Sequence, residues 1–208
     1  MEWRIASIGT LAVHPLWNEG GAPRIGHATT TIIKSSDAVL LVDPSLPPPI
    51  LNAKLQERWG LRLSEVTHVF LTSFDPDRRR TLGALREATW FMHEPEIEFA
   101  NLALIEELRL AEQDSELTLL LEEHVEQLQK FEVPQDALMR GVDLFPLPGY
   151  TRGSCGLLLP TPRRTVLICG DTVATSEHAK QGSVLSTAQD IKLAQESFTE
   201  CVEIADML

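Results

Sequence analysis

The chain has 208 residues, of which 43% are hydrophobic and 23% are charged, a composition that supports a sizeable core and excludes intrinsic disorder. Its 30 acidic residues against 18 basic ones give a net charge of −12, so binding to nucleic acid or to an anionic membrane is not expected. Three cysteines without a CxxC spacing argue against a disulfide scaffold and a cysteine-ligated zinc site. We expect a cytoplasmic protein with a single domain over residues 1–208.

The first half of the chain begins with a predicted β-hairpin. Residues 29–34 and 38–43 are apolar and β-branched, and a polar Ser-Ser-Asp turn joins them. Residues 50–59 form an amphipathic stretch that predicts a helix, and Gly60 suits the position after its last turn. Residues 67–72 are a short apolar run typical of a buried strand.

The second half alternates between helical and strand patterns. Leu117, Leu121, Val125 and Leu128 are spaced by four, four and three residues, which predicts one apolar face of an acidic helix. Three strands and a final helix follow, predicted at residues 142–145, 155–159, 165–169 and 191–205. Strands, helices, strands and a helix in this order are typical of a layered α/β protein.

Polar residues follow three of the predicted strands. Residues 73–80 come directly after the strand at 67–72, residues 147–154 precede another strand, and Asp171 follows the strand at 165–169. Layered α/β folds usually place their sites at such strand ends. These three segments are therefore expected to meet at one rim.

Four blocks of the sequence resemble the metallo-β-lactamase superfamily, in the order that the family uses. Residues 72–78, Thr-Ser-Phe-Asp-Pro-Asp-Arg, resemble Thr-His-x-His-x-Asp-His after a strand. Residues 148–154, Pro-Gly-Tyr-Thr-Arg-Gly-Ser, resemble Pro-Gly-His-Thr-x-Gly-Ser, and residues 166–172 resemble a strand ending in Gly-Asp-Thr. The hairpin that ends at Asp43 also matches. The resemblance implies a four-layer αββα sandwich, most like the group that includes glyoxalase II-type hydrolases.

The family binds two metals, usually zinc, through seven positions, and the resemblance allows six of them to be read here: Ser73, Asp75, Asp77, Arg78, Tyr150 and Asp171. Only Asp77 and Asp171 keep the family's residue type, and all four readable histidines are replaced. The seventh position, a histidine, would lie on a strand beyond Leu208. One interpretation is therefore a domain truncated at its C-terminal end.

These replacements argue against zinc, which prefers imidazole and thiolate ligands. A neutral serine is a poor ligand, and a guanidinium stays protonated and repels a divalent cation. We hypothesise that Arg78 takes over the positive charge of the metal and pairs with Asp77 and Asp171, which would otherwise be two buried, uncompensated carboxylates.

Other interpretations of the same residues remain open. Ser73 as a nucleophile lacks a neighbouring histidine base, so a hydrogen-bonding serine is favoured. Tyr150 could donate a proton, although a structural phenol is favoured. The basic run Arg78–Arg80 could hold an anionic small molecule, but the favoured interpretation has Arg78 paired inward and Arg79 and Arg80 paired with surface acids. Among the histidines, His27 and His178 lie nearest to the expected rim.

Three functions follow. The favoured one is a non-catalytic or strongly diverged homologue, without a cofactor, that binds a small molecule or a protein. The second is a hydrolase of esters, thioesters or phosphodiesters that uses a single Mn²⁺, Mg²⁺ or Zn²⁺ held by Asp75, Asp77 and Asp171. The third is an interaction protein whose acidic helices form a homodimer face. The loss of the histidines favours the first.

Overall fold

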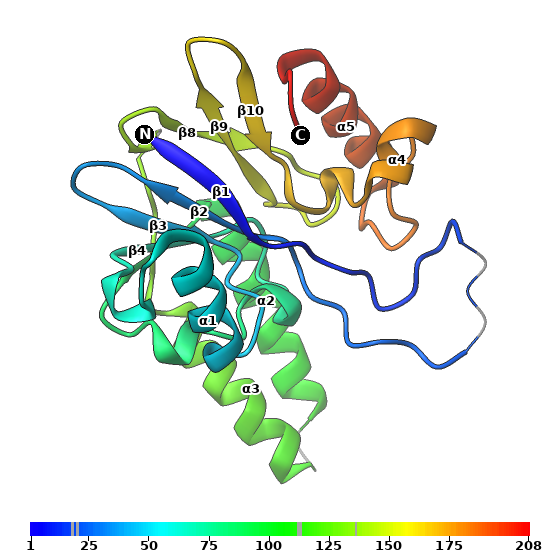
Figure 1. The fold of residues 1–208 in the computed structure, drawn as a ribbon. Helices are drawn as coiled ribbons and strands as arrows, with labels where there is room; N and C mark the ends of the chain where they lie inside the picture. Colours follow the sequence, from blue (N-terminus) through cyan, green and yellow to red (C-terminus); the bar gives the residue numbers. More distant parts are fainter. Residues whose placement is uncertain (18, 20, 112–113, 136) are drawn as a thin grey trace.

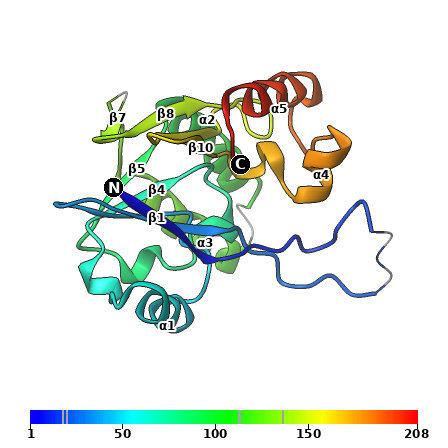
Figure 2. The ribbon, with the colours of Figure 1, turned by 45° about the horizontal axis from the view of Figure 1, so that its top comes forward.

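The structure is a computed structural model that describes residues 1–17, 19, 21–111, 114–135 and 137–208. Two β-sheets stack face to face, and helices lie on the outer side of each sheet (Figures 1 and 2). The predicted four-layer αββα sandwich is therefore confirmed. None of the described helices is both long and apolar enough to cross a membrane.

The first sheet contains six strands in sequential order: β1 (Glu2–Ser7), β2 (Thr30–Lys34), β3 (Val39–Val42), β4 (His68–Leu71), β5 (Thr89–Met92) and β6 (Phe131–Glu132). The first three strands run antiparallel, and β3 to β6 run parallel. The second sheet is antiparallel, in the order β10 (Thr165–Ile168), β9 (Cys155–Pro160), β8 (Val142–Pro146) and β7 (Ala137–Met139). The carboxyl ends of β3 and β4 therefore lie at the same edge of the first sheet.

In the part of the chain that the structure describes, five α-helices complete the layers: α1 (Pro48–Trp59), α2 (Glu94–Leu110), α3 (Ser115–Leu128), α4 (Ser176–Gln181) and α5 (Ile191–Ile204). Helices α1, α2 and α3 contribute to a core on the outer face of the first sheet. Helix α5 packs on the outer face of the second sheet through Cys201. The helices thus seal the two sheet faces that do not face each other.

Alternation along the strands divides the interior into three apolar clusters. In β3, Leu41 packs toward the helices, whereas Leu40 and Val42 pack between the two sheets. All four residues of β3 are buried, because this central strand is covered on both faces. The same alternation in β2 sends Ile32 to the helix side and Ile33 to the space between the sheets.

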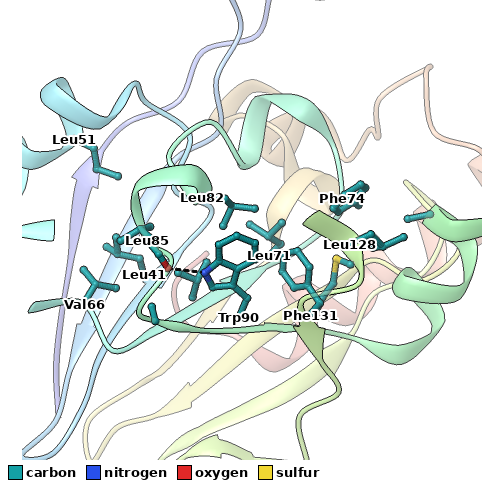
Figure 3. Close-up of a cluster of buried hydrophobic side chains, with 14 of the residues drawn as sticks. Leu41, Leu51, Val66, Leu71, Phe74, Leu82, Leu85, Trp90, Leu128 and Phe131 are labelled. Carbon is teal, nitrogen blue, oxygen red and sulfur yellow. Dashed lines mark hydrogen bonds between the residues drawn. The ribbon is translucent and has the colours of Figure 1, made fainter. Parts of the chain in front are cut away.

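Aromatic side chains join β5 and β6 to the loop that follows β4 (Figure 3). The indole N–H of Trp90 donates to the Leu85 carbonyl at 2.8 Å, which satisfies the polar atom of a buried tryptophan. Phe74 and Phe131 pack edge to face, with ring centroids 6.0 Å apart. This packing fixes the backbone at residue 74, in the middle of the predicted site segment.

The structure confirms the hairpin, the strand at 67–72, the three later strands and the final helix. The sequence patterns missed β1 and β5: β1 is a partly exposed edge strand of mixed polarity, and β5 has only four residues. The expected apolar face of α3 is only partly right, because Leu117 is 42% exposed whereas Leu121 and Leu128 are buried. Gly60 ends α1 in the left-handed conformation, as predicted.

Gly149 tests how closely the loop after β8 packs on α5. Its φ is +131°, and a Cβ atom there would lie 2.2 Å from the backbone nitrogen of Ala194. We expect Gly149→Ala to lower the free energy of unfolding by more than about 3 kcal/mol. Gly182→Ala is the control, because Gly182 also has a positive φ but has open space around it. There we expect a loss of about 1–2 kcal/mol in urea denaturation, and equal losses would contradict the close packing.

Candidate functional site

The ends of three strands meet at one rim, and the sequence predicted two of them, those after β4 and β10. Asp43 directly follows β3, Ser73 and Arg78 lie in the segment after β4, and Asp171 lies in a 3-10 helix after β10. The first two segments come from the first sheet and the third comes from the second sheet. The rim therefore spans both halves of the sandwich.

Arg78 lies at the centre of this rim and is only 2% exposed. Its Nη1 lies 2.9 Å from Asp43 Oδ2, and its Nη2 forms an ion pair with Asp171 Oδ2. Its Nε donates a hydrogen bond to Ser73 Oγ at 2.9 Å. Burial alone lowers the pKa of Arg78, but the carboxylates of Asp171, Asp43 and Asp77 outweigh that effect and hold its pKa above the ordinary value. The guanidinium is therefore a permanent internal cation.

Asp43 is held in place to receive this cation. Its Oδ1 accepts a hydrogen bond from the Thr72 amide at 2.9 Å, and its Oδ2 accepts one from the Thr72 hydroxyl at 2.8 Å. Burial raises the pKa of Asp43, and Arg78 together with the two Thr72 hydrogen bonds opposes that rise. Its φ of +50° is uncommon for a residue other than glycine. These contacts offset the cost of that backbone conformation.

Ser73 contacts the guanidinium directly and links it by a hydrogen bond to Asp75. Ser73 Oγ donates to Asp75 Oδ2 at 2.6 Å while it accepts from Arg78, and Asp75 Oδ2 lies 3.9 Å from Arg78 Nε. The serine hydroxyl therefore acts both as a hydrogen-bond donor and as an acceptor. This matches the structural role that the sequence favoured over a nucleophile.

Asp77 and Tyr150 complete the rim without a direct ion pair among the described residues. Burial raises the pKa of Asp77, and the neighbouring Asp171 and Asp75 add to that rise. Burial and the carboxylates of Asp171 and Asp75 also raise the pKa of Tyr150. Tyr150 therefore presents a neutral phenol, not the phenolate that a metal would need.

The hypothesis that Arg78 pairs with Asp77 and Asp171 is right for Asp171 and wrong for Asp77. Asp43 is the second direct partner, because its position after β3 brings its carboxylate to Nη1. The sequence carried a signal for Asp43, since it ends the hairpin that matches the family. In the sequence analysis, Asp43 serves only as evidence for the fold and is not assigned to the site.

Among the residues that the structure describes, neither Arg79 nor Arg80 forms the expected ion pair with a surface acid. Arg79 donates to the Phe74 carbonyl at 3.1 Å and to Gln127 Oε1 at 2.8 Å, and its guanidinium stacks on the Phe74 ring. Arg80 donates to the Gly26 carbonyl at 2.7 Å. Both arginines therefore tie segments of the chain together, and neither supplies an open anion site at the rim.

The two histidines nearest to the expected rim make structural contacts. His27 lies 3.2 Å from the Ile8 carbonyl through Nε2. His178 is 1% exposed, and its Nδ1 lies 2.9 Å from the Thr175 hydroxyl. The same hydroxyl lies 3.3 Å from His14 Nε2, so this cluster joins the N-terminal segment to α4.

Glu96 is a site residue that the sequence analysis missed. It lies in the first turn of α2, is 1% exposed, and accepts hydrogen bonds from the Phe74 amide at 2.9 Å and the Thr151 hydroxyl at 2.6 Å. Burial raises its pKa to about 7. It links the two loops that carry Ser73 and Tyr150, and no motif in the sequence marks it because its partners lie on distant segments.

The residues at this rim do not fit a divalent metal. Arg78 lies between two of the carboxylates, and a cation placed there would face a fixed positive charge. Within the described part of the chain, no three histidine, cysteine, aspartate or glutamate side chains are arranged to hold a metal ion. The alternative ligand set of Asp75, Asp77 and Asp171 is therefore not assembled in this structure.

Comparison with known proteins agrees with the fold. Residues 23–203 match the sequence pattern of the metallo-beta-lactamase superfamily. The chain belongs to this superfamily. Probable metallo-hydrolases of Mycobacterium bovis and Mycobacterium tuberculosis are each 32% identical to it over 137 residues. The match covers 61% of this chain and 44% of each relative, so it spans less than half of their length.

Solved structures of the superfamily share its fold. The dizinc quorum-quenching lactonase AidC superposes with a TM-score of 0.65 and 16% identity, over 86% of this chain and 69% of the lactonase. An N-acyl homoserine lactone hydrolase with a product at its catalytic metal centre gives 0.64 and 17%, over 97% and 86% of the two chains. At these identities the likeness concerns the fold alone.

Arg78→Met tests whether the guanidinium holds the rim together. We expect it to lower the free energy of unfolding by about 3–5 kcal/mol, because Asp43 would remain buried without its counter-charge. Adding Asp43→Asn should recover part of that loss, since the pair is directly coupled. Arg80→Met removes the same charge from an exposed position and should cost no more than about 0.5 kcal/mol. Similar losses for Arg78→Met and Arg80→Met in urea denaturation would refute the role of Arg78.

Glu96→Gln tests the buried carboxyl through the pH dependence of stability. The pKa of Glu96 is about 7 in the folded chain against an ordinary 4.5, so the folded state binds the proton more tightly between these values. Stability of the wild type should therefore fall as pH rises from about 4.5 to about 7. Glu96→Gln should reduce this fall, whereas Glu94→Gln, at an exposed neighbour, should not. Melting temperatures measured across this range decide the point, and parallel curves for wild type and Glu96→Gln would contradict it.

Proposed function

We propose that this protein is a non-catalytic member of the metallo-beta-lactamase superfamily, in which Arg78 provides the internal cation of the former metal site. The observation that carries the proposal is the ion pairing of a buried guanidinium with Asp43 and Asp171. A guanidinium carries hydrogen-bond donors only. It can therefore neutralise carboxylates, but it cannot coordinate an oxygen atom of water or substrate as a metal ion does. The positive charge beside Asp43 and Asp171 is thus supplied without the chemistry of a metal.

The proposed role is binding at the remodelled rim, to a small molecule or to a protein partner. Asp77 has no direct ion-pair partner among the described residues, and Tyr150 carries a neutral phenol beside it. Carboxylates outnumber the cation at the rim, so a neutral or cationic ligand suits it better than an anionic one. This argument disfavours the anionic ligand that the Arg78–Arg80 run suggested.

Metal analysis and hydrolysis assays test the proposal together. Protein purified without chelators should contain far less than one zinc per chain by mass spectrometry. It should not hydrolyse lactone, ester or phosphodiester substrates above the buffer rate, with or without added Zn²⁺ or Mn²⁺. A variant with Ser73→His, Asp75→His, Arg78→His and Tyr150→His should gain zinc, because imidazole ligands then replace the cation and the weak donors.

The alternative function, a metal-dependent hydrolase, predicts the opposite results for metal content and hydrolysis. Metal near one equivalent in the wild type, with activity that Asp77→Ala or Asp171→Asn abolishes, would overturn the non-catalytic role. Activity that both variants retain would come from elsewhere and would leave the rim without a part in it.

A further inference from the structure

A second cluster of charge lies at the opposite end of the first sheet from the rim. Arg4 of β1, Lys34 at the end of β2 and Arg58 in the last turn of α1 line a cavity of about 530 Å³, together with Met1, Glu2, Ser35 and Trp59. Lys34 pairs with Val39 at the start of β3, whereas the rim lies beyond the end of that strand. The two features are therefore separate.

The strand register explains why these cations share one face. Glu2 lies opposite Lys34, and Arg4 lies opposite Ile32, which packs toward the helices. Cross-strand partners and residues two apart lie on the same side of a sheet, so Glu2, Arg4 and Lys34 all face the helix side. Helix α1 ends at Trp59 and leaves this corner of the sheet uncovered, which creates the hollow.

The cavity wall is partly organised by contacts within the protein. Arg4 Nη1 donates to the Arg58 carbonyl at 2.9 Å, and the Arg4 guanidinium stacks on the Trp59 ring at 4.9 Å. The indole N–H of Trp59 is buried and has no acceptor among the described residues. Arg4 is thus held in place with further N–H donors unused, beside another donor that the protein does not satisfy.

The charge of this cavity is unusual for so acidic a chain. Acidic residues outnumber basic ones by 30 to 18 over the sequence, yet three cations and one glutamate line the hollow. Within the described residues, none of Arg4, Lys34 and Arg58 forms an ion pair with an acidic side chain, and Glu2 is not within ion-pair distance of Lys34. These positive charges remain available to an external anion.

We propose that this cavity binds a small molecule that carries a phosphate or carboxylate group. Guanidinium and ammonium groups are suited to both oxyanions, and the volume lies within the range of small-ligand sites. Trp59 supplies an aromatic wall for the rest of the ligand. The proposal does not depend on the function assigned to the rim.

Titration with inorganic pyrophosphate and with citrate, at constant ionic strength in chloride, tests the site and separates the two oxyanions. Binding is followed by calorimetry and by the NMR signals of the four tryptophan indoles, with the Trp59 signal assigned from Trp59→Phe. We expect saturable binding of at least one anion and a shift of the Trp59 signal, without a shift of the Trp90 signal, since Trp90 lies in the core.

Lys34→Gln with Arg58→Gln should weaken this binding by about tenfold or more and leave the contacts of Arg4 with the Arg58 backbone and the Trp59 ring intact. Arg163→Gln with Arg164→Gln is the matched control, because it removes two exposed charges from the turn between β9 and β10. The control should keep wild-type affinity. No saturable binding of either anion, equal losses in both double variants, or binding that leaves the Trp59 signal unmoved would overturn the proposal.

Discussion

A buried guanidinium needs negative charge close to it, and in this protein that need organises the meeting point of the two sheets. Arg78 follows β4 of the first sheet, Asp43 follows β3 beside it, and Asp171 follows β10 of the second sheet. The ion pair with Asp171 therefore joins the sheets at the edge where their strand ends meet. Each of these groups would be costly to bury alone, and the guanidinium offsets part of the negative charge of its two carboxylate partners.

A divalent metal and a guanidinium stabilise carboxylates in chemically different ways. A catalytic metal keeps an open coordination position that can polarise a water molecule or a substrate. Arginine offers donors in a fixed plane and has no such position. In the role proposed above, Arg78 supplies the structural effect of a cation, and its guanidinium lacks the means to activate water. Ser73 and Asp75 reinforce this arrangement, because their hydroxyl and carboxylate are already engaged around its Nε.

The first sheet carries opposite charge at its two ends. The rim at the carboxyl ends of β3 and β4 gathers Asp43, Asp75 and Asp77 around a single arginine, with Asp171 contributed by the second sheet. The hollow at the other end gathers three basic residues around one glutamate. The ligands that we propose for these two places differ in charge accordingly. A net charge of −12 summed over the chain does not reveal this difference between the two ends.

The patterns in the sequence indicated a layered α/β protein and the residues that follow its strands, and the resemblance to the superfamily indicated the four layers. A short continuous run of apolar and β-branched residues indicates a buried strand whatever its partners are, so residues 67–72 and the hairpin before them could be placed from local pattern. The type of residue at position 78 likewise excluded a metal ligand, since the charge of a guanidinium is intrinsic to the side chain.

Only the tertiary structure decided which carboxylates meet that charge. Asp43 and Asp77 are equally acidic in sequence, but the left-handed turn at Asp43 and its hydrogen bonds from Thr72 bring Asp43, and not Asp77, to Arg78. Glu96 and the basic hollow could not be predicted from the sequence for the same reason, because each depends on segments far apart in the chain. A local sequence pattern gives the chemical type of each residue. The contacts between segments far apart in the chain form only when the sheets and helices pack together.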